Sequence, residues 1–283
     1  LLTAKRGGVM LLIKKHRKLL SIGIAAFFFL AIAVFFGIYD LAISNAIANV
    51  QSGFGLTMEL SGMLVAPYLF ISAGFIIAIY YQKCPEEAFR KTLISLGIFF
   101  AFGGICFCGY IYVQFSSIVS FFAFLFTGLV CGVFIVFLRK KTADQIYELL
   151  KIAVVTIIYL LSVLVFINLI KIFWGRVRFR EMTDPAQFSR WFIPQGITGD
   201  RSFPSGHTAN AATLYVVTMF APLVKKNWQK ALCYIIPILW IVVMAGSRVL
   251  VGAHYASDVL FGAMISVLLF YVCKRIVLAK FQK

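Results

Sequence analysis

The sequence predicts an all-α polytopic membrane protein, a helical bundle with about eight transmembrane spans. Of its 283 residues, 62% are hydrophobic and only 13% are charged, and the mean hydropathy is +0.95. Soluble domains are nearer half apolar and a quarter charged. Apolar runs of about 20 residues recur along the chain, and each is long enough to cross a hydrocarbon layer of ~30 Å. The short alternating segments typical of a membrane β-barrel are absent from the sequence.

The first expected span is the apolar run 19–39, which follows a basic cluster at 14–18. A signal peptide is the alternative, but this run is longer than the core of about 7–15 residues usual there, so we interpret it as an uncleaved helix. Residues 1–18 then form a cytoplasmic segment. Within it, we interpret residues 1–9, which precede Met10, either as an added segment that is not native to the protein or as the product of an alternative translation start. We expect residues 19–283 to form one integral membrane domain.

The next part of the chain supplies three more expected spans. Residues 40–62 contain no Lys or Arg and are expected to form an outer loop with room for an interfacial helix. The second span follows at 63–81. The run 92–138 would extend about 70 Å as a single helix, about twice the thickness of the hydrocarbon layer. It must therefore fold back, near residues 112–117, into the third and fourth spans.

The last four expected spans cover residues 149–173, 205–224, 231–247 and 254–271. With eight spans, both termini and most clusters of Lys and Arg lie on the cytoplasmic side, as the topology of membrane proteins requires. One set of cations falls on the other side, which normally lacks them, and an anionic ligand would explain it. Its members are Lys171, Arg176, Arg178, Arg180, Arg190, Arg201 and Arg248.

The charge and cysteine content exclude other classes. The net charge of +17 comes from short clusters at the ends of apolar runs, so we expect no nucleic-acid partner. The six cysteines lie mostly in apolar runs, where they behave as small hydrophobic residues. Cys106 and Cys108 are two positions apart and would point to different faces of a helix, which argues against a metal site. No disulfide framework is visible.

The tetrapeptide Pro204-Ser205-Gly206-His207 is the first candidate for a functional site. Proline is favoured at the first position of a helix, because its missing N–H would be unpaired there. Ser205 and Gly206 would then offer free backbone N–H groups at the positive end of the helix dipole, where a phosphate can bind. On this motif alone, an ordinary helix start with a buried histidine remains an equal alternative.

A second candidate is the pair His254 and Asp258, which would share one helix face at spacing i, i+4. A carboxylate bonded to one ring nitrogen fixes the tautomer and leaves the other nitrogen basic, as a nucleophilic histidine requires. A structural ion pair is the alternative. Lys171, Arg178 and Arg248 fall at helix ends on the same predicted face and could hold phosphate oxygens. Snorkelling to lipid headgroups suits Arg180, Arg190 and Arg201.

Together these residues supply what phosphoryl transfer needs: cations for the equatorial oxygens, an in-line nucleophile and an acid for the leaving oxygen. We expect neither a metal nor another cofactor, because no cluster of Asp, Glu or His resembles a two-metal site. The order Lys171-x6-Arg178, Pro204-Ser205-Gly206-His207 and Ser247-Arg248-x5-His254-x3-Asp258 resembles the three motifs of the type 2 phosphatidic acid phosphatase (PAP2) superfamily. That superfamily contains membrane lipid phosphatases and soluble vanadium haloperoxidases.

The resemblance covers about the last 115 residues and implies a six-helix core, so two of the eight spans would be additional. Val177 and Phe179 replace prolines usual beside the motif arginine, which changes the stiffness of the loop rather than its charge. By this resemblance, His254 is the nucleophile that forms a phosphohistidine, oriented by Asp258, and His207 protonates the leaving lipid oxygen or activates water. The residues that would hold the phosphoryl oxygens are Lys171, Arg178, Ser205, Gly206 and Arg248.

The sequence thus predicts a lipid phosphate or pyrophosphate phosphatase of the cell membrane, metal-independent, with its active site at the extracytoplasmic face. The expected partners are the bilayer and a lipid phosphate. Undecaprenyl pyrophosphate is the first choice, followed by phosphatidylglycerol phosphate, phosphatidic acid and lipid A phosphates. Ser205 as the nucleophile is disfavoured, because no base–carboxylate pair serves it. Three alternatives remain open: a vanadate-dependent haloperoxidase, transfer of the phosphoryl group between lipids, and a phospholipid-binding or transport protein without turnover. The sequence does not indicate an oligomeric state.

Overall fold

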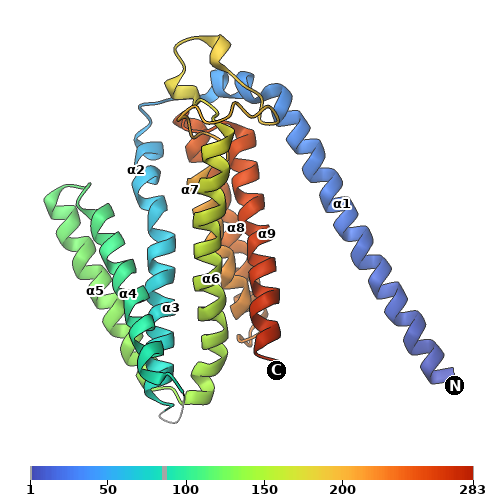
Figure 1. Cartoon of the computed structure of the whole chain (residues 1–283), viewed down its shortest axis with the longest axis vertical. Helices are drawn as coiled ribbons and strands as arrows, with labels where there is room; N and C mark the ends of the chain where they lie inside the picture. The colour runs from blue at the N-terminus through green and yellow to red at the C-terminus, as the bar shows by residue number, and fades with distance from the viewer. Residues whose placement is uncertain (1, 85–87, 283) are drawn as a thin grey trace.

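The computed structural model describes residues 2–84 and 88–282, and the elements in this part of the chain are helices joined by turns and one long polar loop. The α-helices are α1 (Leu2–Ile47), α2 (Gly53–Ser61), α3 (Val65–Gln82), α4 (Arg90–Tyr112), α5 (Ser117–Arg139), α6 (Ala143–Trp174), α7 (Gly206–Ala212), α8 (Asn227–Leu250) and α9 (Ala256–Lys280). Short 3₁₀ helices cover Gly62–Leu64, Phe179–Glu181, Pro185–Gln187 and Thr213–Phe220. The predicted helical bundle is confirmed (Figure 1).

Seven helices in the described part of the chain are long and apolar enough to cross a membrane. They are Gly23–Ile47, Gly53–Gln82, Arg90–Tyr112, Ser117–Arg139, Ala143–Trp174, Asn227–Leu250 and Ala256–Lys280. The fold-back predicted near residues 112–117 is confirmed, because α4 ends at Tyr112 and α5 begins at Ser117. The expected outer loop 40–62 begins later than predicted: Asp40 lies within α1, and α2 is continuous with the second span.

The expected sixth span at 205–224 is shorter than predicted. It consists of α7, with 7 residues, and the 3₁₀ helix Thr213–Phe220, with 8 residues, which together extend about 26 Å. It nevertheless carries the chain from one end of the bundle toward the other, since α8 needs about 36 Å to return to the end where α7 begins. Both termini lie at the same end of the bundle (Figure 1), which requires an even number of passages.

Helix α6 stands at the centre of the bundle and separates two apolar cores. On one side, Tyr159 and Val163 pack with Phe270 of α9 and with Val216 after α7. On the other side, residues 146–157 of α6 pack with residues 73–79 of α3 and with α5. The two cores share α6 as a common wall, so the N-terminal and C-terminal halves of the chain pack against each other.

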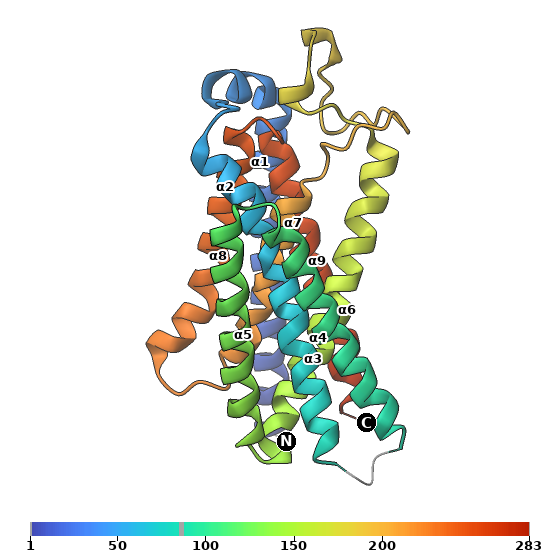
Figure 2. The same cartoon turned by 90° about the vertical axis from the view of Figure 1, so that its left-hand side faces the viewer.

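Glycines allow α3 and α4 to approach closely. A Cβ atom at Gly74 would lie 2.5 Å from the backbone nitrogen of Ala101, and one at Gly97 would lie 2.7 Å from that of Ala78. Real Cβ atoms do not come so close to backbone, and small residues are the usual means by which membrane helices pack. The α4–α5 pair is thereby attached to α3 at the side of the bundle (Figure 2).

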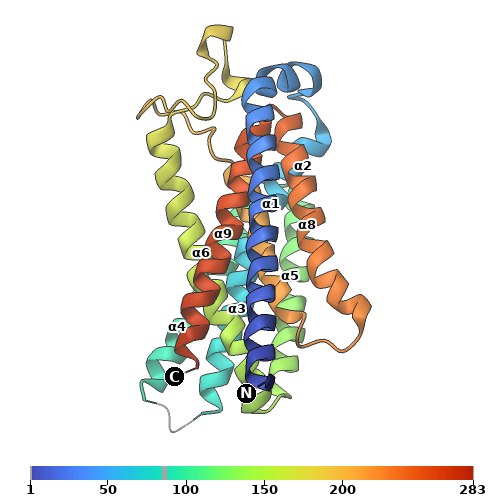
Figure 3. The ribbon, with the colours of Figure 1, turned by 90° about the vertical axis from the view of Figure 1, so that its right-hand side faces the viewer.

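Helix α1 lies on the opposite side, across α8 and α9, and diverges from the bundle toward its N-terminal end (Figures 1 and 3). The polar loop 175–205 and the last part of α1 cover the end of the bundle away from the termini, and α2 lies beside this end as the first part of the second span (Figures 1 and 2). This end gathers the ends of α6 and α8, the beginnings of α7 and α9, and most of the residues singled out in the sequence.

Candidate active site

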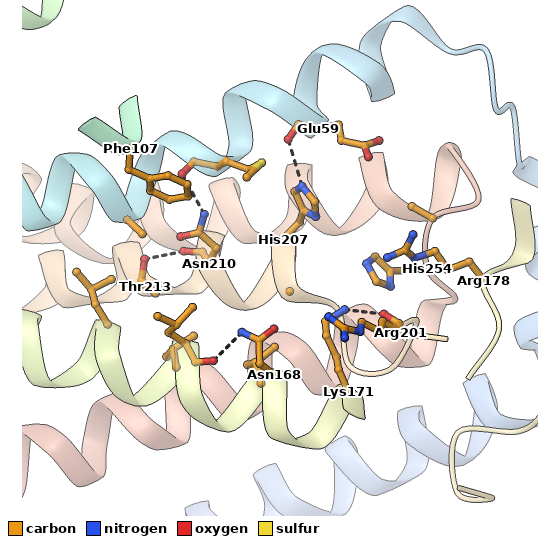
Figure 4. A pocket seen from close by; sticks show the side chains of 18 of the residues that line it. Glu59, Phe107, Asn168, Lys171, Arg178, Arg201, His207, Asn210, Thr213 and His254 are labelled. Carbon is orange, nitrogen blue, oxygen red and sulfur yellow. Dashed lines mark hydrogen bonds between the residues drawn. The ribbon is translucent and has the colours of Figure 1, made fainter. Parts of the chain in front are cut away.

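A cavity of about 550 Å³ opens at the loop-covered end of the bundle (Figure 4). One part of it is lined by charged and histidine side chains, and the other by apolar side chains that continue down between α3, α4 and α6. The lining comprises Glu59, Met63, Ala66, Phe70, Phe107, Leu160, Val163, Leu164, Ile167, Asn168, Lys171, Arg178, Arg180, Arg201, Gly206, His207, Asn210, Thr213, Ala253 and His254. The two predicted histidines therefore share one cavity, with Lys171 and Arg178 of the predicted cation set.

His207 enters the cavity from the first turn of α7. Ser205 caps this helix by accepting a hydrogen bond from the Thr208 N–H (3.3 Å), so Pro204 precedes the cap rather than occupying the first helical position as predicted. The Ser205 N–H donates to the Asp258 carbonyl oxygen (2.9 Å) and is not free for an anion, which corrects a second expectation. Gly206 keeps its place in the cavity lining beside Lys171.

The ring of His207 is held by the backbone of α2. Its Nε2 lies 3.2 Å from the carbonyl oxygen of Glu59. A carbonyl can only accept, so this contact assigns the Nε2 proton and leaves Nδ1 as the ring nitrogen that can exchange a proton. The sequence offered no signal for this partner, since Glu59 precedes His207 by 148 residues.

His254 lies in the turn between α8 and α9, not on α9 as predicted, because α9 begins only at Ala256. The turn is possible because Gly252 adopts φ +63°. Asp258 sits in the first turn of α9 and accepts a hydrogen bond from the Tyr255 N–H (2.9 Å). His254 Nδ1 is 3.7 Å from Asp258 Oδ2, longer than the predicted hydrogen bond, and has no hydrogen-bond partner among the described residues.

Asp258 is instead fixed by Arg176, which the sequence analysis placed in the cation set without assigning it a partner, and by Ser202, which it did not select. Its Oδ1 accepts from Arg176 Nη1 (2.6 Å), and its Oδ2 accepts from Ser202 Oγ (2.6 Å). Asp258 and Ser202 are fully buried and Arg176 is 1% exposed. A buried carboxylate is stable only when its oxygens are paired in this way. The carboxylate that points one oxygen toward His254 is therefore held rigidly.

The cations of the cavity have different surroundings. Lys171 is almost buried at the end of α6, and its Nζ donates to the carbonyl oxygen of Arg201 (2.7 Å). Arg178 forms an ion pair with Glu181 (2.7 Å), and Arg180 forms a bidentate pair with Glu59 (3.2 and 3.3 Å). Arg180 and Arg201, for which the sequence analysis favoured snorkelling to lipid headgroups, also line the cavity. Figure 4 shows Lys171, Arg178 and Arg201 around His254.

Two predicted phosphate-binding residues do not line this cavity. Arg248 is fully buried, donates to the carbonyl oxygen of Gly55 and pairs with Glu59 (3.2 Å). Ser205 is also fully buried, and its Oγ lies 3.0 Å from Thr208 Oγ1. Arg248 does not line the cavity itself but forms an ion pair with Glu59, which does.

Burial lowers the pKa of His254 to about 3. The ammonium of Lys171 and the ring of His207 act in the same direction, while Asp258 opposes them. The ring is therefore neutral in the folded protein, whereas in the unfolded chain it takes up a proton below about pH 6.5. We expect the wild-type protein to lose more stability than His254→Gln as the pH falls from 6.5 toward 3. Thermal unfolding in detergent between pH 8 and 4 checks this; parallel pH dependences would contradict it.

The packing of α9 on the turn before α7 gives a second expected outcome. A Cβ atom at Gly262 would overlap the Ser205 carbonyl oxygen and lie 3.2 Å from the Ser205 nitrogen. Gly262→Ala should therefore push α9 from the His207 turn, at a cost of about 1–3 kcal/mol, and lower activity. Gly246→Ala is the matched control, since a Cβ there meets open space. Unfolding temperature and activity of the two proteins check it. Equal behaviour would contradict the packing argument.

Parts of the chain resemble known proteins. Residues 148–282 match the family model described as the PAP2 superfamily. Phosphatidylglycerophosphatase B of Bacillus subtilis (strain 168) is 40% identical over 88 residues, which are 29% of this chain and 42% of that protein. The chain thus matches less than half the length of this relative. No solved structure matches the chain.

Proposed function

Since residues 148–282 belong to the PAP2 superfamily, we propose that the chain is an integral membrane lipid phosphatase. The observation that carries the proposal is the two-part cavity, in which Lys171, Arg178 and both histidines stand at one end and Phe70, Phe107 and apolar residues of α6 line the other. A phosphate headgroup fits the first part and a hydrocarbon tail the second. The cavity continues between helices, so a lipid would not have to leave the bilayer completely.

The proposed reaction has two steps. In the first, the unprotonated Nε2 of His254 attacks phosphorus, a phosphorus–nitrogen bond forms, and the bond from phosphorus to the leaving oxygen breaks. His207 begins this step with Nδ1 protonated and donates that proton to the leaving oxygen. The negative charge on the equatorial oxygens is stabilised by Lys171, Arg178 and the Gly206 N–H. In the second step, His207 takes a proton from water, which attacks phosphorus and releases inorganic phosphate from His254.

The remaining proposed residues act on these groups. Asp258 is proposed to orient His254 by closing the 3.7 Å between its Oδ2 and Nδ1 when substrate is bound, which leaves Nε2 as the attacking atom. Ser205 caps the helix that carries His207. Arg248 is proposed to bind a phosphoryl oxygen after it separates from Glu59, because a phosphate competes with a carboxylate for the same guanidinium. No metal is proposed in any step.

For the substrate, we propose undecaprenyl pyrophosphate first and phosphatidylglycerol phosphate second, followed by phosphatidic acid and lipid A phosphates. Arg201 at the cavity adds positive charge to that of Lys171 and Arg178, which supports a headgroup with two phosphates. The printed name of the Bacillus relative supports the second choice.

We further propose that the termini are cytoplasmic and that the cavity opens at the extracytoplasmic face. Lys83 after α3, Arg139 at the end of α5, Lys226 before α8 and Lys274 in α9 all lie toward the end of the bundle that carries the termini. Positive residues in short loops favour the cytoplasmic side. Residues 19–283 are proposed to act as one integral membrane domain.

The test is release of inorganic phosphate by the purified protein in detergent micelles, with a panel of the four lipid phosphates, in EDTA. Release from at least one lipid, with none from a soluble phosphate ester at the same concentration, is expected. Binding of the lipids without release would favour a non-catalytic carrier, and a phosphorylated acceptor lipid would favour transfer. Halide oxidation that depends on added vanadate would favour a haloperoxidase. Activity that requires an added metal would overturn the metal-independent mechanism.

A further inference from the structure

Helix α1 contributes one carboxylate to the surroundings of the site, although it precedes the segment that matches the family. Most of its described apolar side chains are exposed, but Ala33, Asp40 and Ser44 are fully buried. A carboxylate inside a membrane helix is costly unless it is paired, so its presence points to a role. Asp40 is not among the residues that line the cavity itself.

Asp40 is joined to the beginning of α9 and to the loop after α6. Its Oδ2 accepts a hydrogen bond from Arg176 Nη2 (2.9 Å) and one from the Ser257 hydroxyl, and its Oδ1 accepts from the Ser257 N–H (2.9 Å). Every one of these groups is nearly or fully buried. The contact is therefore specific and excludes water.

Arg176 connects Asp40 to Asp258. Its guanidinium is 1% exposed and donates through Nη2 to Asp40, through Nη1 to Asp258 (2.6 Å) and through Nε to the Ser189 carbonyl oxygen (2.8 Å). The ring of Tyr255 lies 4.0 Å beneath it. Burial opposes the charged form, and the two carboxylates more than offset it, so the pKa of Arg176 is raised above its ordinary value. The Arg176 guanidinium thus stays charged and is fixed between the carboxylates of Asp40 and Asp258.

We propose that Asp40 is a positioning residue of the proposed phosphatase, holding Arg176 so that Asp258 keeps one oxygen directed at His254. This inference rests on the proposed function. Without the charge of Asp40, Arg176 would lose one of its two anionic partners. Its guanidinium would then be attracted by Asp258 alone and would be free to shift toward it. That carboxylate would then be misplaced and less able to stabilise the positive charge that develops on the His254 ring.

The experiment compares Asp40→Asn with Ser44→Ala in the full-length protein, in detergent. Ser44 lies one turn along α1, is fully buried, and its hydroxyl has no hydrogen-bond partner among the described residues. Losses of about 10- to 100-fold are typical when a group that orients a reactive side chain is removed. We expect a fall of that size in kcat for Asp40→Asn, with KM nearly unchanged because Lys171 and Arg178 are untouched. Ser44→Ala should resemble the wild-type protein in both constants.

The double variant Asp40→Asn/Arg176→Lys separates positioning from general damage. If Asp40 acts through Arg176, the double variant should be no slower than Arg176→Lys alone. Multiplied effects, an unchanged kcat in Asp40→Asn, or a loss expressed only in KM would overturn the inference. Wild-type protein without any phosphatase activity would instead overturn the proposed function.

Should Asp40→Asn not fold, Ser257→Ala serves as the second variant. It removes a hydroxyl that contacts both Asp40 and Arg176 but leaves the three charges in place. A fall in kcat of about 5-fold, the equivalent of one hydrogen bond, is expected at unchanged KM. An unchanged kcat would overturn the inference.

Discussion

Replacing His254 by glutamine should lower phosphate release by at least about 1,000-fold, because glutamine fills similar space but cannot form the covalent bond to phosphorus. The cavity and its cations would remain, so the variant should still bind the lipid. Binding of a radiolabelled lipid phosphate and release of phosphate, measured on the same preparation, separate these two properties.

The chain offers a matched control for this substitution. His16 is exposed on α1, far along that helix from the cavity. His16→Gln should therefore keep the activity of the wild-type protein. If His254→Gln retained more than about a tenth of the wild-type rate, nucleophilic attack by this residue would be excluded.

His207→Gln should slow hydrolysis of a lipid phosphomonoester by about 10²- to 10⁴-fold, the usual contribution of a general acid. The leaving group of a monoester is an alkoxide, which needs a proton as the bond breaks. The leaving group of a lipid pyrophosphate is a lipid phosphate, which is a far weaker base. Loss of the proton donor should therefore cost much less with the pyrophosphate.

The rates of the first step measure this difference, as lipid product released in a single turnover by His207→Gln, each divided by the wild-type rate, because they do not include the attack of water in the second step. An equal loss on both would mean that His207 acts by shape or charge rather than as a proton donor. The substitution leaves Glu59 unchanged, and the glutamine amide can donate to the same Glu59 carbonyl oxygen that the His207 ring contacts.

Local patterns in the sequence were sufficient for most of the fold. The apolar run 92–138 was too long for one span, and the structure divides it at the predicted position. The passage from Ser205 was predicted too long, because the apolar run does not reveal that half of it is wound as a 3₁₀ helix, or that Pro204 lies outside the cap.

The site was predictable where its residues lie in recognisable motifs. His207, His254, Lys171 and Arg178 were selected from the sequence and line one cavity. The hydrogen bond expected between His254 and Asp258 is absent from the described residues, since the helix begins two residues later than the i, i+4 argument assumed. Spacing indicates a shared face only when both residues are helical.

The partners of these residues could not be predicted, because they come from distant parts of the chain. Glu59 contacts His207 across 148 positions, and Asp40 contacts Ser257 across 217. Each is an isolated acidic residue, with no other charged residue close to it in the sequence. Only the packing of α1 and α2 against the C-terminal half brings them to the site.

The most direct test of the account is to trap the enzyme during turnover of a lipid labelled in its phosphate. The protein is quenched in alkali, where phosphohistidine survives, digested, and mapped by mass spectrometry. The account predicts an acid-labile phosphate on His254, absent from His254→Gln. Phosphate on Ser205, or rapid turnover with no labelled protein at any time point, would contradict it.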